Sequence, residues 1–176
     1  IDDMGRVVQS GSPKPGKGSK GATAARTADK PQGQPVPSKQ AKTRPVDRKL
    51  AAARALDEYK AAYALYNDGS IDEARAAFIE FVDKYPAHAY ADNARYWVGE
   101  CWYDVRDYEK ARAEFMKVVS DYPDGNKVPD AMVKVGLCDQ NLGRADDARR
   151  MYDAVILTYP DSEAAGVAMK FMERLK

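Results

Sequence analysis

The chain has 176 residues, of which 44% are hydrophobic and 31% are charged, and its 28 Lys and Arg almost balance its 27 Asp and Glu. This length suits one ordinary domain with a tail. No run of eighteen or more apolar residues occurs in the sequence, so we predict no direct membrane span. The chain opens with Ile1 and lacks the layout of a signal peptide, so we expect a fragment or a processed chain whose precursor carried any signal peptide.

The charges divide unevenly between two segments. Residues 1–50 hold eleven Lys and Arg against four Asp, so a basic segment of about +7 precedes a body of about −6 in residues 51–176. From Ser10 to Pro45 the sequence consists mainly of Gly, Pro, Ser, Lys, Gln, Ala and Thr, with almost nothing apolar to bury. We therefore predict a disordered, extended and basic linker over residues 10–46.

The basic linker does not indicate nucleic-acid binding, because its lysines are spread out and no aromatic residues lie among them. A weak contact with an anionic polymer is left open. Residues 1–9 have apolar side chains at positions 1, 4, 7 and 8, which would suit the last turns of a helix or coiled coil. Two heptads are not present, so the coiled coil is only a hypothesis.

The strongest pattern in the sequence is an internal repeat of 37 residues. Tyr-Pro pairs stand at residues 85–86, 122–123 and 159–160. The same step relates Ala74, Ala111 and Ala148, the aromatic residues Phe78, Phe115 and Tyr152, and the small residues Ala62, Gly99 and Gly136. Self-similarity at this period predicts stacked units of one supersecondary structure.

Each unit is predicted to be a pair of antiparallel helices. In the second unit, apolar residues recur at spacings of three and four, first over residues 94–105 and then over residues 108–119. Turns are indicated between the paired helices at residues 68–69, 106–107 and 142–143. The proline after each second helix ends it, because the ring removes a hydrogen-bond donor and clashes with the preceding turn.

Two helix ends carry further signals. Residues 70–73, Ser-Ile-Asp-Glu, have the sequence of a capping box. Residues 162–176 have apolar side chains at positions 165, 168, 169, 172 and 175, and we predict that they cap the stack. We expect an all-α solenoid over residues 47–176, with helix pairs at about 53–86, 90–123 and 127–160, a capping helix at 162–176, and a long first helix from about Asp47 to Asn67.

The spacing within each unit resembles the tetratricopeptide (TPR) motif. In that motif a small residue is eighth in the first helix, Ala follows twelve residues later, an aromatic residue four further, and Pro twelve after the Ala. All three units match, the first with Ala62 where Gly is usual. The period of 37 differs from the usual 34, and the three added residues fall between the Pro and the next helix. The resemblance implies a TPR solenoid that binds other proteins.

The longer period resembles one group of bacterial envelope proteins. Through the runs Tyr96–Gly99 and Tyr159–Ser162, residues 59–176 are similar to the C-terminal domain of the Tol-Pal system periplasmic family YbgF, or CpoB. That family's order of coiled coil, variable linker and TPR domain also fits. The resemblance implies a periplasmic adaptor that contacts TolA or cell-wall synthases and coordinates cell-wall synthesis with outer-membrane constriction in cell division. It also implies a homo-oligomer formed through a missing N-terminal region.

Two other functions remain open at this point. Repeats that end in Tyr-Pro also occur in the outer-membrane assembly lipoprotein BamD and in secretin pilotins, so an assembly factor for outer-membrane proteins or secretins is the main alternative. A general scaffold in the cytoplasm is a third hypothesis.

We expect a partner to bind in a concave groove lined by the first helix of each pair. Tyrosine and asparagine can hold a peptide at a small cost in side-chain entropy, although tyrosines also pack between repeats. The acidic body favours a basic or neutral partner, or the chain's own tail. Counting along the helices gives these groove candidates: Tyr59, Tyr63, Tyr66, Asn93, Tyr96, Glu100, Tyr103, Asp130, Gln140 and Asn141.

No catalytic residues, metal site or cofactor are predicted. The only histidine, His88, lies in a segment between repeats, where we expect a surface turn residue. The sequence has no phosphate-binding Gly-rich loop and no Cys-x-x-Cys. Cys101 and Cys138 are 37 residues apart, and equivalent positions on packed helices are farther apart than a disulfide allows. We expect two buried free thiols in preference to a bridge.

Overall fold

The computed structural model describes residues 45–175. The predicted helical segment at residues 1–9 lies outside the described residues, as does the predicted linker except for its last two residues. Within residues 45–175 there are seven helices and no strand: α1 (Pro45–Asn67), α2 (Ile71–Lys84), α3 (Ala91–Asp104), α4 (Tyr108–Asp121), α5 (Val128–Asn141), α6 (Ala145–Thr158) and α7 (Glu163–Arg174). The predicted fold class is confirmed.

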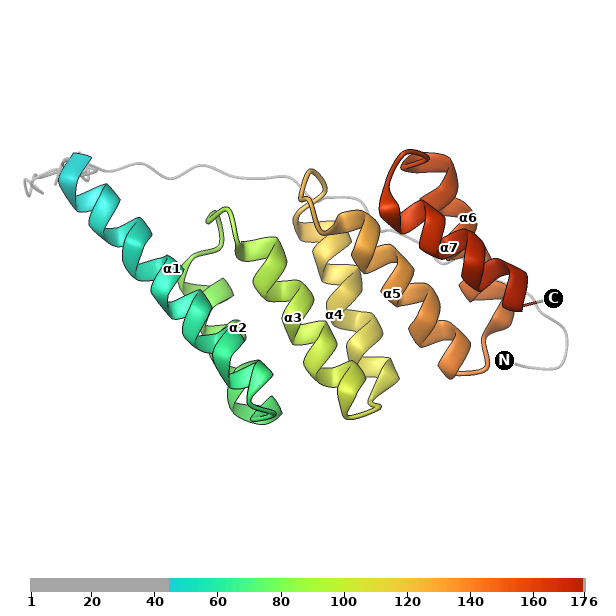
Figure 1. The fold of residues 1–176 in the computed structure, drawn as a ribbon, viewed down its shortest axis with the longest axis horizontal. Coiled ribbons are helices and arrows are strands. Elements are labelled where there is room, and N and C mark those ends of the chain that lie inside the picture. Colours follow the sequence, from blue (N-terminus) through green and yellow to red (C-terminus); the bar gives the residue numbers. More distant parts are fainter. Residues whose placement is uncertain (1–44, 176) are drawn as a thin grey trace, which may run out of the picture. The chain divides into compact units, whose positions relative to one another are not determined.

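The helices stack in chain order as three pairs followed by one single helix. Helix α1 packs on α2, α3 on α4, and α5 on α6, and each pair packs on the next through α2 and α3, through α4 and α5, and through α6 and α7. Helices α1, α3, α5 and α7 lie side by side on one face of the stack (Figure 1). We call these four the A helices and their common face the A face; α2, α4 and α6 are the B helices.

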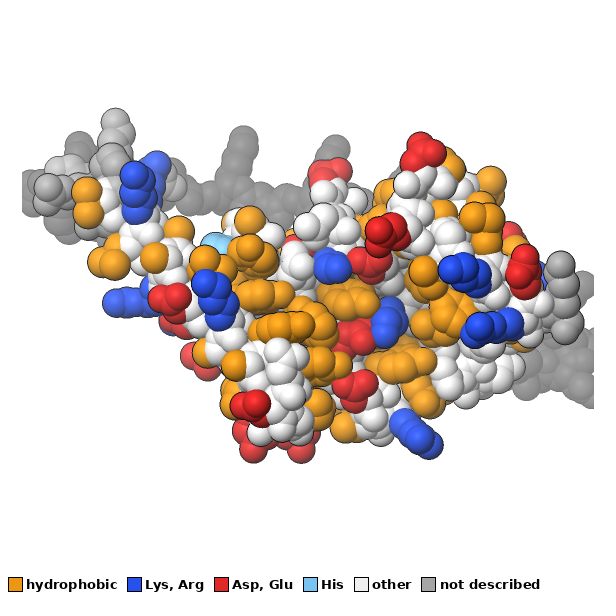
Figure 2. All heavy atoms as spheres, viewed as in Figure 1, with side chains coloured by type: hydrophobic (Ala, Val, Ile, Leu, Met, Phe, Trp, Pro, Cys, Tyr) orange, Lys and Arg blue, Asp and Glu red, His pale blue; other side chains and the backbone are white. Residues whose placement is uncertain are grey.

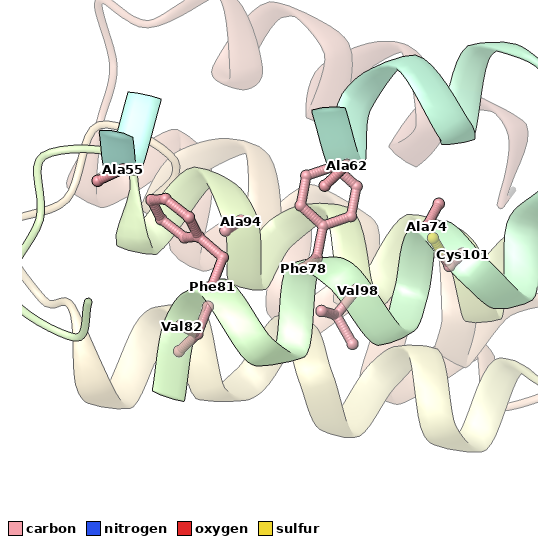
Figure 3. Packing of buried hydrophobic residues seen from close by; sticks show 9 residues of the cluster. All are labelled: Ala55, Ala62, Ala74, Phe78, Phe81, Val82, Ala94, Val98 and Cys101. Atoms are coloured by element: carbon pink, nitrogen blue, oxygen red, sulfur yellow. The ribbon is translucent and has the colours of Figure 1, made fainter. Parts of the chain in front are cut away.

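Close contact within each pair depends on the small residue of the A helix. A Cβ atom added to Gly99 would lie 2.6 Å from the ring of Phe115, and one added to Gly136 would overlap the ring of Tyr152. The first pair has Ala62 at this position, fully buried in one cluster with Phe78 (Figure 3). The repeated pattern of a small residue and an aromatic ring thus brings each A helix against its own B helix.

The helix ends agree with the sequence pattern at the prolines but not at the capping box. The B helices end at Lys84, Asp121 and Thr158, each two residues before its proline. Ser70 is the N-cap residue of α2, but its side chain accepts no hydrogen bond from the helix, so the capping-box prediction is wrong.

Backbone geometry explains why Ser70 fails to cap while another serine succeeds. Ser162 has an extended ψ of 152°, and its hydroxyl accepts from the Ala165 N–H at 3.1 Å. Ser70 has a ψ of 65°, which does not aim its short side chain at the free amides. Asp107 has a similar ψ of 73°, yet its longer carboxylate reaches the Lys110 N–H at 3.2 Å.

Arginines of the B helices bind each repeat to the next. Arg75 lies over the ring of Trp102, 3.9 Å from its centroid. One repeat later, Arg112 donates through Nε to Asp139 Oδ1 at 2.7 Å. One repeat further, Arg149 donates to the carbonyl of Leu175 at 3.2 Å. The arginine is constant while its partner changes, so the Ala-Arg pairs of the sequence hold neighbouring repeats together.

The turn inside each pair needs a left-handed residue at one repeated position. Gly69 and Gly143 have φ values of 80° and 75°, and Arg106 occupies the same position of the second repeat with φ 61°. A side chain in this conformation costs about 1–2 kcal/mol, because its Cβ approaches the following carbonyl. The second turn is therefore strained where the other two are not.

We predict that Arg106→Gly raises the free energy of unfolding by about 0.5–1 kcal/mol. Relief of strain exceeds the backbone entropy that glycine adds to the unfolded chain. Urea denaturation of the full chain measures the change. The reverse substitution, Gly143→Ala, has no atom within 4 Å of the added Cβ and should lower stability by about 1 kcal/mol. An unchanged midpoint for Arg106→Gly would contradict the argument.

A second prediction concerns the buried carboxylate of Asp139, which is fully buried and has one oxygen, Oδ2, without a hydrogen-bond partner. Arg112→Ala should lower the free energy of unfolding by about 3 kcal/mol, because it removes the close partner of a buried charge. Arg144 remains at 3.9 Å and compensates only weakly.

Adding Asp139→Leu to Arg112→Ala should recover most of that loss, since an apolar residue of similar size needs no partner. Chemical denaturation of the unaltered chain, the two single variants and the double variant measures these changes in the free energy of unfolding. A loss below about 1 kcal/mol for Arg112→Ala would mean that the pair behaves like an exposed one.

Candidate functional site

The A face carries side chains from the same few positions of successive repeats. Tyr66 and Tyr103 are 37 residues apart and form equivalent contacts with the next A helix. The Tyr66 hydroxyl donates to Asp104 Oδ2 at 2.6 Å, and the Tyr103 hydroxyl accepts from Asn141 Nδ2 at 3.1 Å. Each tyrosine thus bridges two A helices, and its half-buried ring is held in a fixed place on the face.

Trp97 of α3, which the groove prediction did not include, lies at the centre of an aromatic group with the predicted Tyr59, Tyr63 and Tyr66. The rings of Tyr63 and Tyr66 lie 4.9 Å and 4.8 Å from its indole ring. Its Nε1–H donates to the Tyr59 hydroxyl at 3.0 Å. Tyr63 is the most exposed of the predicted tyrosines, with 37% of its surface accessible. The group forms a rigid aromatic surface between α1 and α3.

The sequence held a signal for this tryptophan. Residues 93, 97, 100 and 104 follow one another at helical spacings of four, three and four, so Trp97 and Asp104 lie on the same stripe as the predicted Asn93 and Glu100.

Glu100 is the charged centre of the A face. Only 8% of its surface is accessible, and its Oε2 accepts from Lys134 Nζ at 2.7 Å. Its other oxygen, Oε1, is closed to solvent and accepts no well-formed hydrogen bond from the described residues, although the Tyr96 hydroxyl interacts with the same carboxylate. Burial raises the pKa values of the Tyr66 and Tyr96 hydroxyls, and negative charge raises them further, from Asp104 and then Glu100 at Tyr66 and from Glu100 at Tyr96. Glu100 therefore places negative charge among the aromatic rings.

A hollow of about 290 Å³ continues the A face between α3, α5 and α7. Its lining is mainly apolar, with one acid and one base at the rim. The lining residues are Tyr96, Asp130, Val133, Lys134, Leu137, Ala164, Val167 and Phe171. We call it the α5–α7 groove. The capping helix thus supplies part of the surface, which the sequence reasoning had limited to the three helix pairs.

The acid and base at the rim are partly engaged by neighbours. Asp130 accepts from Lys127 at 2.9 Å. The Lys134 ammonium lies over the ring of Tyr103, 4.8 Å from its centroid, while it donates to Glu100. The aromatic group and the α5–α7 groove therefore meet at Glu100 and Lys134, and hydrophobic side chains gather across this face with charged ones among them (Figure 2).

Three predicted groove residues have their main contacts away from these two surfaces. Tyr59 stacks on Tyr90 of the segment between repeats at 4.9 Å, in addition to its bond with Trp97. Asn93 donates to Asn126 of the following segment at 3.3 Å. Gln140 accepts from the Tyr152 hydroxyl of α6 at 3.2 Å. Their contacts support the packing of the repeats.

The described residues contain no group of three or more His, Cys, Asp or Glu side chains that could hold a metal ion. His88 lies in the predicted segment between repeats, where it is half-buried and accepts from the Tyr90 N–H at 3.2 Å through Nδ1. Of the helices in residues 45–175, none is long and apolar enough to cross a membrane.

Comparison with known proteins gives a family and a fold. The model of the YfiO family, described as an outer membrane lipoprotein, matches residues 52–176. No curated protein matches the chain significantly.

Among solved structures, the first TPR of Spaghetti (RPAP3), bound to an HSP90 peptide, has a TM-score of 0.58 at 15% identity, covering 70% of this chain and 91% of its own. PcrH from Pseudomonas aeruginosa has 0.59 at 19%, covering 70% and 92%. The type III secretion translocator chaperone SycD from Yersinia enterocolitica has 0.59 at 14%, covering 72% and 93%. These likenesses identify the fold as a TPR solenoid.

The cysteines yield a prediction about reactivity. Both Cys101 and Cys138 are free and buried, and burial raises the pKa of each thiol to about 12. At pH 8 the thiols stay protonated, so the folded chain should react with a thiol reagent about 100-fold more slowly than an exposed cysteine. Two thiols per chain should react in strong denaturant. Fast labelling of either one in the folded chain would contradict this burial.

Proposed function

We propose, because this chain belongs to the YfiO family of outer membrane lipoproteins and folds as a TPR solenoid, that it is a non-enzymatic adaptor of the bacterial cell envelope. It binds a segment of a partner protein along the A face. The observation that carries this proposal is the junction of the aromatic group around Trp97 with the α5–α7 groove. Fixed aromatic rings beside an apolar hollow are typical of a protein-binding surface.

Several features support binding in preference to catalysis. The tyrosines of the A face are held by bonds between repeats, so little entropy is lost when a segment binds on them. The thiols are buried and protonated, and the single histidine is tied into a turn. The TPR of RPAP3 was solved with a bound HSP90 peptide, so the fold that this chain shares is one on which a peptide can bind.

As the partner system we propose the Tol-Pal machinery, with the chain in the periplasm and TolA or cell-wall synthases as partners. The adaptor would coordinate cell-wall synthesis with outer-membrane constriction during cell division. The support is the resemblance of residues 59–176 to the YbgF or CpoB family, through the 37-residue period and the two runs that begin at Tyr96 and Tyr159.

A second candidate is an assembly factor for outer-membrane proteins, or a pilotin for secretins. The family description as an outer membrane lipoprotein favours it, as do the Tyr-Pro pairs that end each repeat. The likeness to PcrH and SycD does not separate the two candidates, since identities of 14–19% inform about the fold alone.

Crosslinking and pulldown from a native envelope extract, with the full chain as bait, distinguishes the candidates. Recovery of TolA or cell-wall synthases supports the Tol-Pal adaptor. Recovery of outer-membrane barrel proteins or a secretin supports the assembly factor. A bait that recovers neither group, under conditions where a known Tol-Pal protein captures its partners, would contradict both.

The A-face assignment has its own prediction. Tyr63→Ala should weaken capture of the recovered partner about tenfold or more, because it removes an exposed ring from the aromatic group. Ile79→Ala on α2 is the matched control, since both side chains are 37% exposed and Ile79 lies on a B helix. Titration of the partner against each variant measures the effect. Equal losses for the two variants would place the binding surface elsewhere.

A further inference from the structure

We propose that the A face recognises a partner segment carrying one Lys or Arg side chain next to a large apolar side chain. This inference rests on the proposed function and specifies the chemistry of its ligand. The basic side chain binds Glu100 and Asp104 among the rings of Tyr66, Trp97 and Tyr103. The apolar side chain enters the α5–α7 groove.

The basic half of the motif follows from Glu100. The Glu100 side chain is about nine-tenths buried, its Oε2 is bonded to Lys134, and its Oε1 is closed to solvent. A ligand that displaces Lys134 and donates to this carboxylate would form a strong, charge-assisted hydrogen bond. The site therefore favours a donor with positive charge.

The surrounding rings favour the same ligand. Trp97 and Tyr66 lie side by side at 4.8 Å, and a cation is attracted to the face of such rings. The protein already uses this geometry, since Lys134 donates to Glu100 while lying over Tyr103. An incoming guanidinium would share the carboxylate with Lys134 or displace it toward Asp130. Asp104, which is exposed and accepts from Tyr66, adds a second negative charge at the same site.

The apolar half of the motif follows from the α5–α7 groove. Val167 is 39% exposed, and it lines this hollow with Leu137 and Phe171. A volume of about 290 Å³ has room for one large apolar side chain. Because Lys134 lies both in the groove lining and on Glu100, the two halves of the motif are adjacent, and one short segment can reach both.

The occupant is a partner segment, since the linker of residues 10–45 does not match this chemistry, and the one basic–apolar pair before it, Arg6-Val7, is included in the test below. Between Ser10 and Pro45 the tail is basic, but Val36 is its only large apolar residue. A binding site for this linker would use the acid and leave the groove empty.

The experiment is a selection from a random peptide library on the full chain. We expect enrichment of peptides with Lys or Arg beside Leu, Ile, Phe or Met. Selection on Glu100→Gln should lose the preference for a basic residue and keep the apolar one. Selection on Val167→Asp should lose the preference for an apolar residue and keep the basic one. For the best peptide, fluorescence anisotropy should show about tenfold weaker binding to Glu100→Gln, and circular dichroism checks that each variant is folded.

Asp104→Asn is a milder variant at an exposed position and should weaken binding in the same direction. Enrichment of acidic peptides, or a basic preference that survives Glu100→Gln, overturns this inference while leaving binding at the A face intact. Binding unaffected by Tyr63→Ala overturns the proposed function itself. Stronger peptide binding after replacement of Arg6 and the tail lysines by Gln identifies the tail as occupant. Dimerisation lost in Val167→Asp identifies a second copy. Either of these two results also overturns the inference.

Discussion

The structure depends on contacts between one repeat and the next, because a single helix pair cannot bury its apolar surface alone. The 37-residue step repeats the means of making that contact. The B-helix arginine of each repeat reaches the following A helix, and tyrosines join successive A helices by hydrogen bonds. Where the arginine meets Trp102 it uses a ring, and where it meets Asp139 it uses a buried charge. The same position between repeats is therefore filled by a cation–ring contact in one case and by an ion pair in the other.

The A face is a consequence of the same stacking. Ordering the A helices side by side places equivalent positions in a row, so a tyrosine that bridges repeats also presents its ring outward. Structural and binding roles therefore belong to the same residues, as Tyr66 and Glu100 illustrate. Residues that depart from the repeat indicate which positions serve binding. Glu100 is one of them, since it stands where the neighbouring repeats have Tyr63 and Leu137.

The sequence predicted the helices well because their ends depend on local chemistry, such as the prolines after Tyr85, Tyr122 and Tyr159. The failure at Ser70 arose because a cap depends on the backbone ψ together with the length of the side chain, as the longer Asp107 shows at a similar ψ. Contacts between repeats were also missed. The link from Arg112 to Asp139 requires the packing of α4 on α5, and the α5–α7 groove requires the position of α7, which the sequence had indicated only as a cap.

The order of contacts along the stack has a mechanical consequence. The main contacts join helices that are adjacent or next but one in the chain, so no long-range strand or disulfide fastens the two ends of the described domain together. Under tension between its ends, such an array yields one repeat at a time and regains each repeat when the load falls.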